Sequence, residues 1–318
     1  GLFLPSLFYE CSYSFKLSDP HFKILEAIPC SLIELHAENQ YQNVLVLKQR
    51  GEFSEAIKIL LEIKEILKKY HQNEGYLKIL LDLVDLKISL KQYSDAVKFL
   101  HNAEDLSKQT DVSILAIMKI HKNFIRIYGY LNKPEQIHSR LDIIQKFLKA
   151  YNSSGFDSNR ILVEIYLEAA KSFLQLNDLD NAHKYFKLLL KNAEPYDDLV
   201  FLYYFNRGYY YKQARSINKQ ITSLQRALSL KSAGKENILD ILYELALVYY
   251  SHKSDIKKAL KYINQAENLE IKYNYENLNL LVDILKLKKD IFQTTDEIEK
   301  EARTNKKINK FQEKLAEL

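Results

Sequence analysis

The chain has 318 residues and a formal net charge of +5, with acidic and basic residues interspersed along it. Only 7 Gly and 5 Pro leave few tight turns, and this composition is typical of an almost wholly helical chain. The mild charge favours a solvated surface over a stripe that binds nucleic acid. No segment has the length of a membrane span, and Cys11 and Cys30 have neither metal-ligand spacing nor the density of a secreted disulfide framework. We expect a cytoplasmic protein that does not contact a membrane.

Residues 1–36 differ from the rest of the chain. Lys23 to Leu35 predicts a short helix, a break at Pro29 and a second helix. This segment resembles the end of a Cro/repressor-type helix-turn-helix domain, in which a Ser-Leu-x-Glu-Leu run such as Ser31 to Leu35 follows a short apolar helix. The segment is expected to be either a partial helix-turn-helix or a cap on the first repeat.

Residues 37–275 repeat about every forty residues. Each unit opens its second helix with one residue, usually small, and two apolar residues follow at spacings of 4 and 3, which places each trio on one helix face. The pattern predicts an all-α, right-handed superhelical solenoid of about six helix pairs similar to tetratricopeptide (TPR) repeats. The trios are Ala56, Leu60, Ile63; Ala96, Leu100, Ala103; Ile137, Leu141, Ile144; Ala182, Phe186, Leu189; Gln220, Leu224, Ala227; and Ala259, Ile263, Ala266.

The first helix of the fifth unit carries the clearest signature. Tyr204, Gly208 and Tyr211 are 4 and 3 residues apart and share a face. Gly208 is the small residue that lets a partner helix approach closely, whereas Asn206 points away from that packed seam.

Residues 276–318 are expected to form capping or dimerisation helices. Thr294 to Glu297 predicts a capping box for a highly charged last helix. Its apolar stripe is compatible with a dimer seam or with a cap that closes the solenoid, and consists of Ile308, Phe311, Leu315 and Leu318.

The search for catalytic motifs is negative. The glycines are too scattered for a phosphate-binding loop, and the eight histidines have no metal-ligand spacing, so each is expected at the surface or at a helix cap. Neither cysteine lies in a nucleophile motif. We expect no catalysis, no metal and no cofactor.

A row of polar residues runs along the first helices of the units. These residues lie two positions before the small residue of each first helix, within otherwise apolar segments, and they are Gln42, Asp82, Asn123, Glu168, Asn206 and Glu244. First helices line the concave side of such a solenoid, so the row predicts a ligand groove, although single members can equally be interhelical hydrogen bonds. Amides can bond both polar groups of a peptide backbone, and a Lys/Arg pair suits a carboxylate. Same-face neighbours that complete the candidate site are Lys119, Arg126, Lys171, Tyr209 and Gln213.

The forty-residue repeat, the Leu25 to Leu35 segment and the Tyr204 to Tyr211 stretch together resemble one family. These are the peptide-pheromone receptors of Gram-positive bacteria, the RRNPP family of Rap, Rgg and PlcR types. The resemblance implies a short peptide held in the concave groove through asparagines, here Asn123 and Asn206, with weaker cases for Glu168 and Glu244. It also implies a homodimer, with DNA binding only through a more complete N-terminal domain.

Two functions from different classes follow. The first is a peptide-binding regulator, a quorum-sensing transcription regulator by the resemblance, which places its ligand's carboxylate near Lys119 or Arg126. The alternative is a constitutive TPR scaffold that holds the tail of a partner protein. A phosphatase-regulating role like that of the Rap branch would need a helical docking bundle that the N-terminal sequence does not show.

Overall fold

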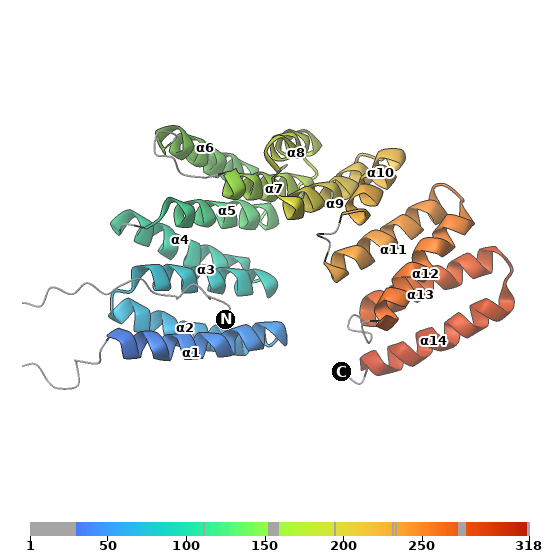
Figure 1. Cartoon of the computed structure of the whole chain (residues 1–318), viewed down its shortest axis with the longest axis horizontal. Helices are drawn as coiled ribbons and strands as arrows, with labels where there is room; N and C mark the ends of the chain where they lie inside the picture. The colour runs from blue at the N-terminus through green and yellow to red at the C-terminus, as the bar shows by residue number, and fades with distance from the viewer. Residues whose placement is uncertain are drawn as a thin grey trace, which may run out of the picture. The chain divides into compact units, whose positions relative to one another are not determined.

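The protein is described from a computed structural model covering residues 30–110, 112–151, 159–193, 195–230, 232, 234–272 and 278–316. These residues contain fourteen α-helices and no strand (Figure 1). The predicted all-α helical-repeat fold is therefore confirmed. The helices are α1 (Cys30–Gln49), α2 (Phe53–Lys69), α3 (Asn73–Ser89), α4 (Tyr93–Gln109), α5 (Ile114–Tyr130), α6 (Pro134–Tyr151), α7 (Asn159–Gln175), α8 (Leu179–Ala193), α9 (Asp197–Gln213), α10 (Ile217–Leu228), α11 (Lys235–Ser251), α12 (Ile256–Lys272), α13 (Leu278–Thr294) and α14 (Ile298–Ala316).

The chain forms two compact units, which we call the N-terminal unit (Gly1–Leu176) and the C-terminal unit (Asn177–Leu318). The first contains α1–α7 and the second α8–α14, a division that the repeat pattern does not indicate. The boundary expected at residues 36 and 37 falls inside the continuous helix α1. Residues 1–29, most of the predicted N-terminal segment, and the boundary expected at 275 and 276 lie outside the described residues.

The core of each unit is built from the predicted trios. Every member of the six trios is at most 3% exposed. In the N-terminal unit, Ala56, Leu60 and Ile63 of α2 pack in one cluster with Val44 of α1 and Leu83 of α3. Burial of one complete face per helix is what lets short amphipathic helices form a stable stack.

The loops that join the two helices of each pair share one backbone conformation. Each contains a residue with positive φ shortly after the first helix, a conformation that turns the chain and lets N–H groups of the loop bond the last carbonyl groups of the helix. At Gly51 the N–H bonds the Lys48 carbonyl at 3.2 Å, and the next N–H bonds the Leu47 carbonyl at 3.0 Å. The positive-φ residues of the seven such loops are Gly51, Lys91, Asn132, Asn177, Arg215, Ser254 and Asp296.

Gly208 has the packing role that its sequence position predicts. It is buried in α9, and a Cβ atom added there would lie 2.4 Å from Cδ2 and 2.8 Å from Cγ of Leu224 in α10. Leu224 is itself 1% exposed in the core of the C-terminal unit. The absent side chain therefore sets how closely these two helices approach.

The last two helices form a further pair. Ile308 and Phe311 of α14 pack against Leu281, Val282 and Leu285 of α13. Leu315 is partly buried against the same cluster, whereas Leu318 lies outside the described residues. Three of the four stripe residues thus cap the C-terminal unit within the chain itself.

The predicted capping box is wrong. Helix α14 begins at Ile298, after Asp296 with φ +54°, so Thr294 is the last residue of the preceding helix. The Thr295 hydroxyl donates to the Ile291 carbonyl at 3.1 Å instead of accepting an N–H of α14. The threonines end one helix because a hydroxyl next to a free carbonyl bonds back to its own turn.

Replacing Gly208 by Ala tests the close approach of α9 and α10. Alanine favours a helix by about 1 kcal/mol over glycine, but overpacking a filled core costs about 1–3 kcal/mol. We expect net destabilisation, measured as a lower urea midpoint with an unchanged slope. In a Leu224→Ala background the same substitution should stabilise, and a destabilisation of equal size in both backgrounds would contradict the contact.

Candidate functional site

Helix α5 is the centre of the candidate site. Its first turn is capped by Ser113, whose hydroxyl accepts the Ala116 N–H at 3.2 Å. Nine of its 17 residues are buried, because it contacts α4, α6 and α7. Helices with such apolar surroundings keep polar side chains only along a narrow stripe.

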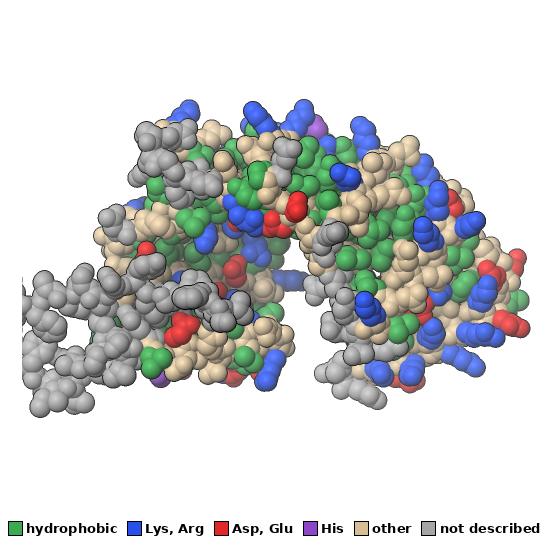
Figure 2. Space-filling view, in the orientation of Figure 1, with side chains coloured by type: hydrophobic (Ala, Val, Ile, Leu, Met, Phe, Trp, Pro, Cys, Tyr) green, Lys and Arg blue, Asp and Glu red, His purple; other side chains and the backbone are tan. Residues whose placement is uncertain are grey.

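That stripe recurs on the neighbouring odd-numbered helices, which we call the inner helices. Counted from the first residue of α3, α5 and α7, positions 6, 10 and 13 are 4 and 3 residues apart and share a face. They form three rows across the helices: Lys78, Lys119, Glu164; Asp82, Asn123, Glu168; and Asp85, Arg126, Lys171. Lys/Arg and Asp/Glu side chains gather over this part of the N-terminal unit (Figure 2).

A groove of about 570 Å³ lies along these rows, and we call it the α3–α5 groove. Its volume is in the range of small-ligand sites. The lining combines four acids and four cations with an apolar patch from α3 and the start of α5. The lining residues are Tyr41, Glu74, Leu77, Lys78, Leu81, Asp82, Asp85, Val112, Ser113, Leu115, Ala116, Lys119, Lys122, Asn123, Arg126 and Glu168.

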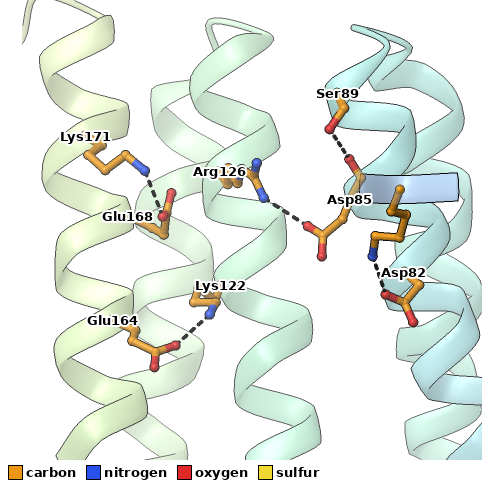
Figure 3. A network of polar contacts seen from close by, with 9 residues as sticks. Asp82, Asp85, Ser89, Lys122, Arg126, Glu164, Glu168 and Lys171 are labelled. Carbon is orange, nitrogen blue, oxygen red and sulfur yellow. Dashed lines mark hydrogen bonds and ion pairs between the residues drawn. The ribbon is translucent and has the colours of Figure 1, made fainter. Parts of the chain in front are cut away.

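Ion pairs connect the inner helices across the face (Figure 3). Arg126 of α5 donates to Asp85 of α3 at 3.0 Å, and Lys122 of α5 donates to Glu164 of α7 at 2.7 Å. These contacts join residues about forty positions apart, so they depend on how the repeats stack. They fix the register of α5 between its two inner neighbours.

Helix α1 is joined to α3 in the same way. The Tyr41 hydroxyl donates to Asp82 at 2.8 Å and the Lys48 ammonium to the same carboxylate at 3.1 Å. Burial raises the pKa of Tyr41 above its ordinary value, and the Asp82 carboxylate adds to the effect. Tyr41 therefore stays a neutral hydrogen-bond donor in the groove wall.

Asp85 is held in a less polar setting than a surface carboxylate. Burial raises its pKa, the Arg126 guanidinium opposes that rise, and Asp82 adds to it. The Arg126 guanidinium favours the charged form of this carboxylate and so opposes the effect of its burial.

Asn123 is the member of the polar row without an internal partner. Its side chain lines the α3–α5 groove, yet the residue is only 8% exposed. Its amide has no hydrogen-bond partner anywhere in the described part of the chain. The amide atoms are not among the fully buried unpartnered ones and so open into the groove, where a ligand would supply both a donor and an acceptor.

A buried polar cluster lies on the opposite side of α5. It contains His121, so the expectation that every histidine lies at the surface or at a helix cap is wrong. His121 is 5% exposed and lies 3.3 Å from an Arg140 nitrogen of α6. Arg140 also binds Glu104 of α4 and stacks on Phe124 at 3.7 Å from the ring centroid. The cluster connects α4, α5 and α6 behind the groove.

The C-terminal unit contains the other predicted residues. The Asn206 amide donates to the Leu202 carbonyl of its own helix at 2.8 Å. Glu244 is 9% exposed and accepts from Lys212 at 2.7 and 2.9 Å. Burial raises the pKa of Tyr209, with Glu244 as the next cause, which places that hydroxyl near the Glu244 carboxylate. Gln213 is exposed in the last turn of α9.

The nine predicted site residues thus divide between the units. Four line the α3–α5 groove, and Lys171 joins them by donating to Glu168 at 3.0 Å; these five are Asn123, Lys119, Arg126, Glu168 and Lys171. The prediction missed Tyr41 and Lys122 as groove residues. In the sequence, these two residues differ from the packing residues around them only by a polar group on an inner helix, and the repeat pattern does not distinguish them.

The described residues offer neither a cluster of metal ligands nor a membrane-spanning helix. No group of three or more His, Cys, Asp or Glu side chains in them is placed to hold a metal ion. None of their helices combines the length and apolar composition that crossing a bilayer requires.

Comparison with known proteins supports the fold. No family model and no curated protein sequence matches the chain. A signal transduction ATPase with a TPR sensor from Pyrococcus horikoshii is 17% identical, with a TM-score of 0.58, over 85% of this chain and 45% of that one. NprR in complex with its cognate peptide NprX is 17% identical, with a TM-score of 0.51, over 84% of this chain and 76% of NprR.

A third solved structure is the Rap conjugation gene regulator of plasmid pLS20 in complex with a Phr peptide. It is 16% identical, with a TM-score of 0.53, over 87% of this chain and 96% of that one. At such identities the similarity establishes the architecture alone, which is a helical repeat of the TPR type.

The cluster behind the groove predicts a loss of stability in acid. Burial lowers the pKa of His121 from 6.5 to about 4, with Arg140 adding to it, so between those values the unfolded chain binds a proton that the folded chain does not. Burial would raise the pKa of Glu104, but the Arg140 hydrogen bond and charge outweigh it and lower that pKa below 4.5. Stability should therefore fall from pH 6.5 to 4 through His121, and below 4.5 through Glu104.

Urea unfolding of the wild type at several pH values measures this slope. His121→Gln should remove on the order of 2 kcal/mol of the change between pH 6.5 and 4. His252→Gln, at an exposed histidine, is the matched control and should keep the wild-type slope. An unchanged slope in His121→Gln would disprove the assignment.

Proposed function

We propose that the protein binds a short peptide in extended form in the α3–α5 groove, with the peptide backbone bonded to Asn123. The observation that carries this proposal is the nearly buried, unpartnered amide of Asn123 in a groove of ligand size. A primary amide matches an extended backbone because it offers a donor and an acceptor side by side. The apolar patch of Leu77, Leu81 and Leu115 supplies side-chain contacts.

The dimensions of the inner face favour a short ligand. The groove lies along α3 and α5, which have 17 residues each and are therefore about 25 Å long at 1.5 Å per residue. An extended strand rises about 3.3 Å per residue, so about eight residues would span that distance. This length agrees with a signalling peptide better than with a long partner tail.

We propose further that the peptide is a regulatory signal. Two proteins that share this fold, NprR and the Rap regulator, are seen in complex with peptides, and the sequence resemblance points to the same class. A ligand regulates only if it binds one conformation more tightly than another. The cytoplasmic location, the homodimer, and DNA binding through a more complete N-terminal domain stay predictions, as does the constitutive scaffold as the alternative.

Equilibrium dialysis against a synthetic mixture of random eight-residue peptides, read by mass spectrometry, tests peptide binding. The wild type should enrich a subset with a shared motif, and Asn123→Ala should weaken those peptides roughly ten- to thirtyfold, because two bonds of about 1 kcal/mol each are lost. Asn102→Ala, at an exposed position of α4, is the matched control. The proposal would be contradicted if no peptide were enriched, or if Asn123→Ala bound the enriched peptides as tightly as the wild type does.

The same peptides test the contribution of the C-terminal unit. Asn206→Ala in the Asn123→Ala background should weaken binding further if the second asparagine contacts the ligand. Because the Asn206 amide already bonds the Leu202 carbonyl, an unchanged affinity would assign Asn206 to its own helix and restrict the site to the N-terminal unit.

A further inference from the structure

The inner helices of the N-terminal unit carry six cationic side chains on or beside the groove, and four of them are neutralised. Each of the four forms an ion pair with a carboxylate of the inner helices. The pairs are Lys48 with Asp82 at 3.1 Å, Lys122 with Glu164 at 2.7 Å, Arg126 with Asp85 at 3.0 Å and Lys171 with Glu168 at 3.0 Å.

Lys78 and Lys119 are the remaining two. Both are exposed, line the α3–α5 groove and occupy position 6 of successive inner helices. Neither has a carboxylate at ion-pair distance within the described residues, and the Lys78 ammonium lies over the Tyr41 ring at 4.3 Å from its centroid. Burial lowers the pKa of Lys78, and Lys48 and Lys119 contribute to that lowering against the opposing Asp82 and Glu38. The two cations are therefore close enough to interact, and an anion between them would relieve their repulsion.

We propose that Lys78 and Lys119 bind the free terminal carboxylate of the peptide, so that the groove recognises a C-terminus and not an internal segment. This inference rests on the proposed function and chooses between its two candidate cations. Binding at Arg126 would require the ligand to displace Asp85, whereas binding at the lysine pair breaks no existing ion pair. Among the described cations of this face, Lys78 and Lys119 are those that no carboxylate holds at ion-pair distance, so the ligand's carboxylate is placed there.

The spacing along α5 fits a chain end. Asn123 lies four residues after Lys119, which is about 6 Å along the helix axis at 1.5 Å per residue. An extended chain covers that distance in about two residues. A carboxylate at Lys119 therefore places the backbone about two residues upstream of the C-terminus at the Asn123 amide.

The surroundings also define the last side chain of the ligand. Val112, Leu115 and Ala116 at the start of α5 line the groove together with Leu77 of α3. Leu115 is 38% exposed, so this apolar surface is available to a ligand. The first turn of α5 carries no acidic residue that would repel the carboxylate. The C-terminal residue of the peptide is accordingly apolar.

Two mixtures of random eight-residue peptides separate this inference from the proposed function. Both end in Leu, Ile, Val or Phe, and one carries a free carboxylate whereas the other carries a C-terminal amide. The wild type should retain the most enriched free-acid peptides about five- to twentyfold more tightly than their amides. The double variant Lys78→Gln/Lys119→Gln should bind both forms alike, at the wild-type affinity for the amides.

Matched controls address general charge and folding. Lys58→Gln/Lys98→Gln removes two exposed lysines of α2 and α4 and should keep the wild-type preference for the free acid. The unfolding temperature of both double variants should equal that of the wild type. Arg126→Gln should weaken the free-acid and amide forms by the same factor, because it disturbs the groove without removing the carboxylate site.

The outcomes are distinct. Equal retention of free-acid and amidated peptides by the wild type overturns the carboxylate site, and if Asn123→Ala still weakens both forms, peptide binding itself stands. A free-acid preference that Arg126→Gln abolishes and Lys78→Gln/Lys119→Gln does not would overturn the choice of cations. Preference for free-acid peptides with a charged last residue would overturn the apolar terminus.

Discussion

Each inner helix of this fold is packed by neighbours on most of its circumference, and this constraint shapes both the core and the surface. In α5 the packing leaves positions 6, 10 and 13 as the stripe on which polar groups line the groove. Burying a polar group without a bond is unfavourable, so every other position is either apolar or tied into a cluster such as His121 with Arg140. Polar side chains that face the groove are thereby confined to a few positions that recur on successive inner helices.

Electrostatic pairing then decides which of those positions remain available. The ion pairs of Arg126 and Lys122 connect α5 to α3 and α7 and neutralise four groups of the inner face. Partly exposed pairs of this kind add little stability each, but they hold the two long side chains of each pair in one geometry. The groups left unpaired in the described part of the groove include the Asn123 amide and the ammonium groups of Lys78 and Lys119. In the proposed function, selectivity for a ligand would come from these groups, which the fold does not use.

Much of the fold follows from local patterns in the sequence. The 4-and-3 spacing of the trios needs only the helical period, and for that reason every trio residue is buried. The capping box at Thr294 failed because a loop residue with positive φ, Asp296, delayed the helix start, which the threonine motif alone does not reveal. The break between two compact units at Leu176 has no signature in the repeat.

For the candidate site, the sequence predicted polar positions but not the partners to which they bond. The polar row drew attention to Asn123, which lines the α3–α5 groove, because an amide inside an apolar helix is conspicuous. Partners were not predictable, since Asp85 and Arg126 are 41 positions apart and meet only through the stacking of whole repeats. A single-sequence pattern therefore locates the polar positions of such a groove but not which of them are already bonded.

Asn123 and Asn206 show why that distinction matters. They occupy the same position of their helices, two residues before the small or apolar residue of the seam, and the sequence treats them alike. In α9 the amide turns back to the Leu202 carbonyl, a local bond that any partly buried asparagine in a helix can form. In α5 the amide stays unbonded at the floor of a groove bordered by unpaired lysines. Equivalent residues in a repeat protein thus differ in their hydrogen bonding, and of these two amides the one in α5 is open to the ligand that we propose.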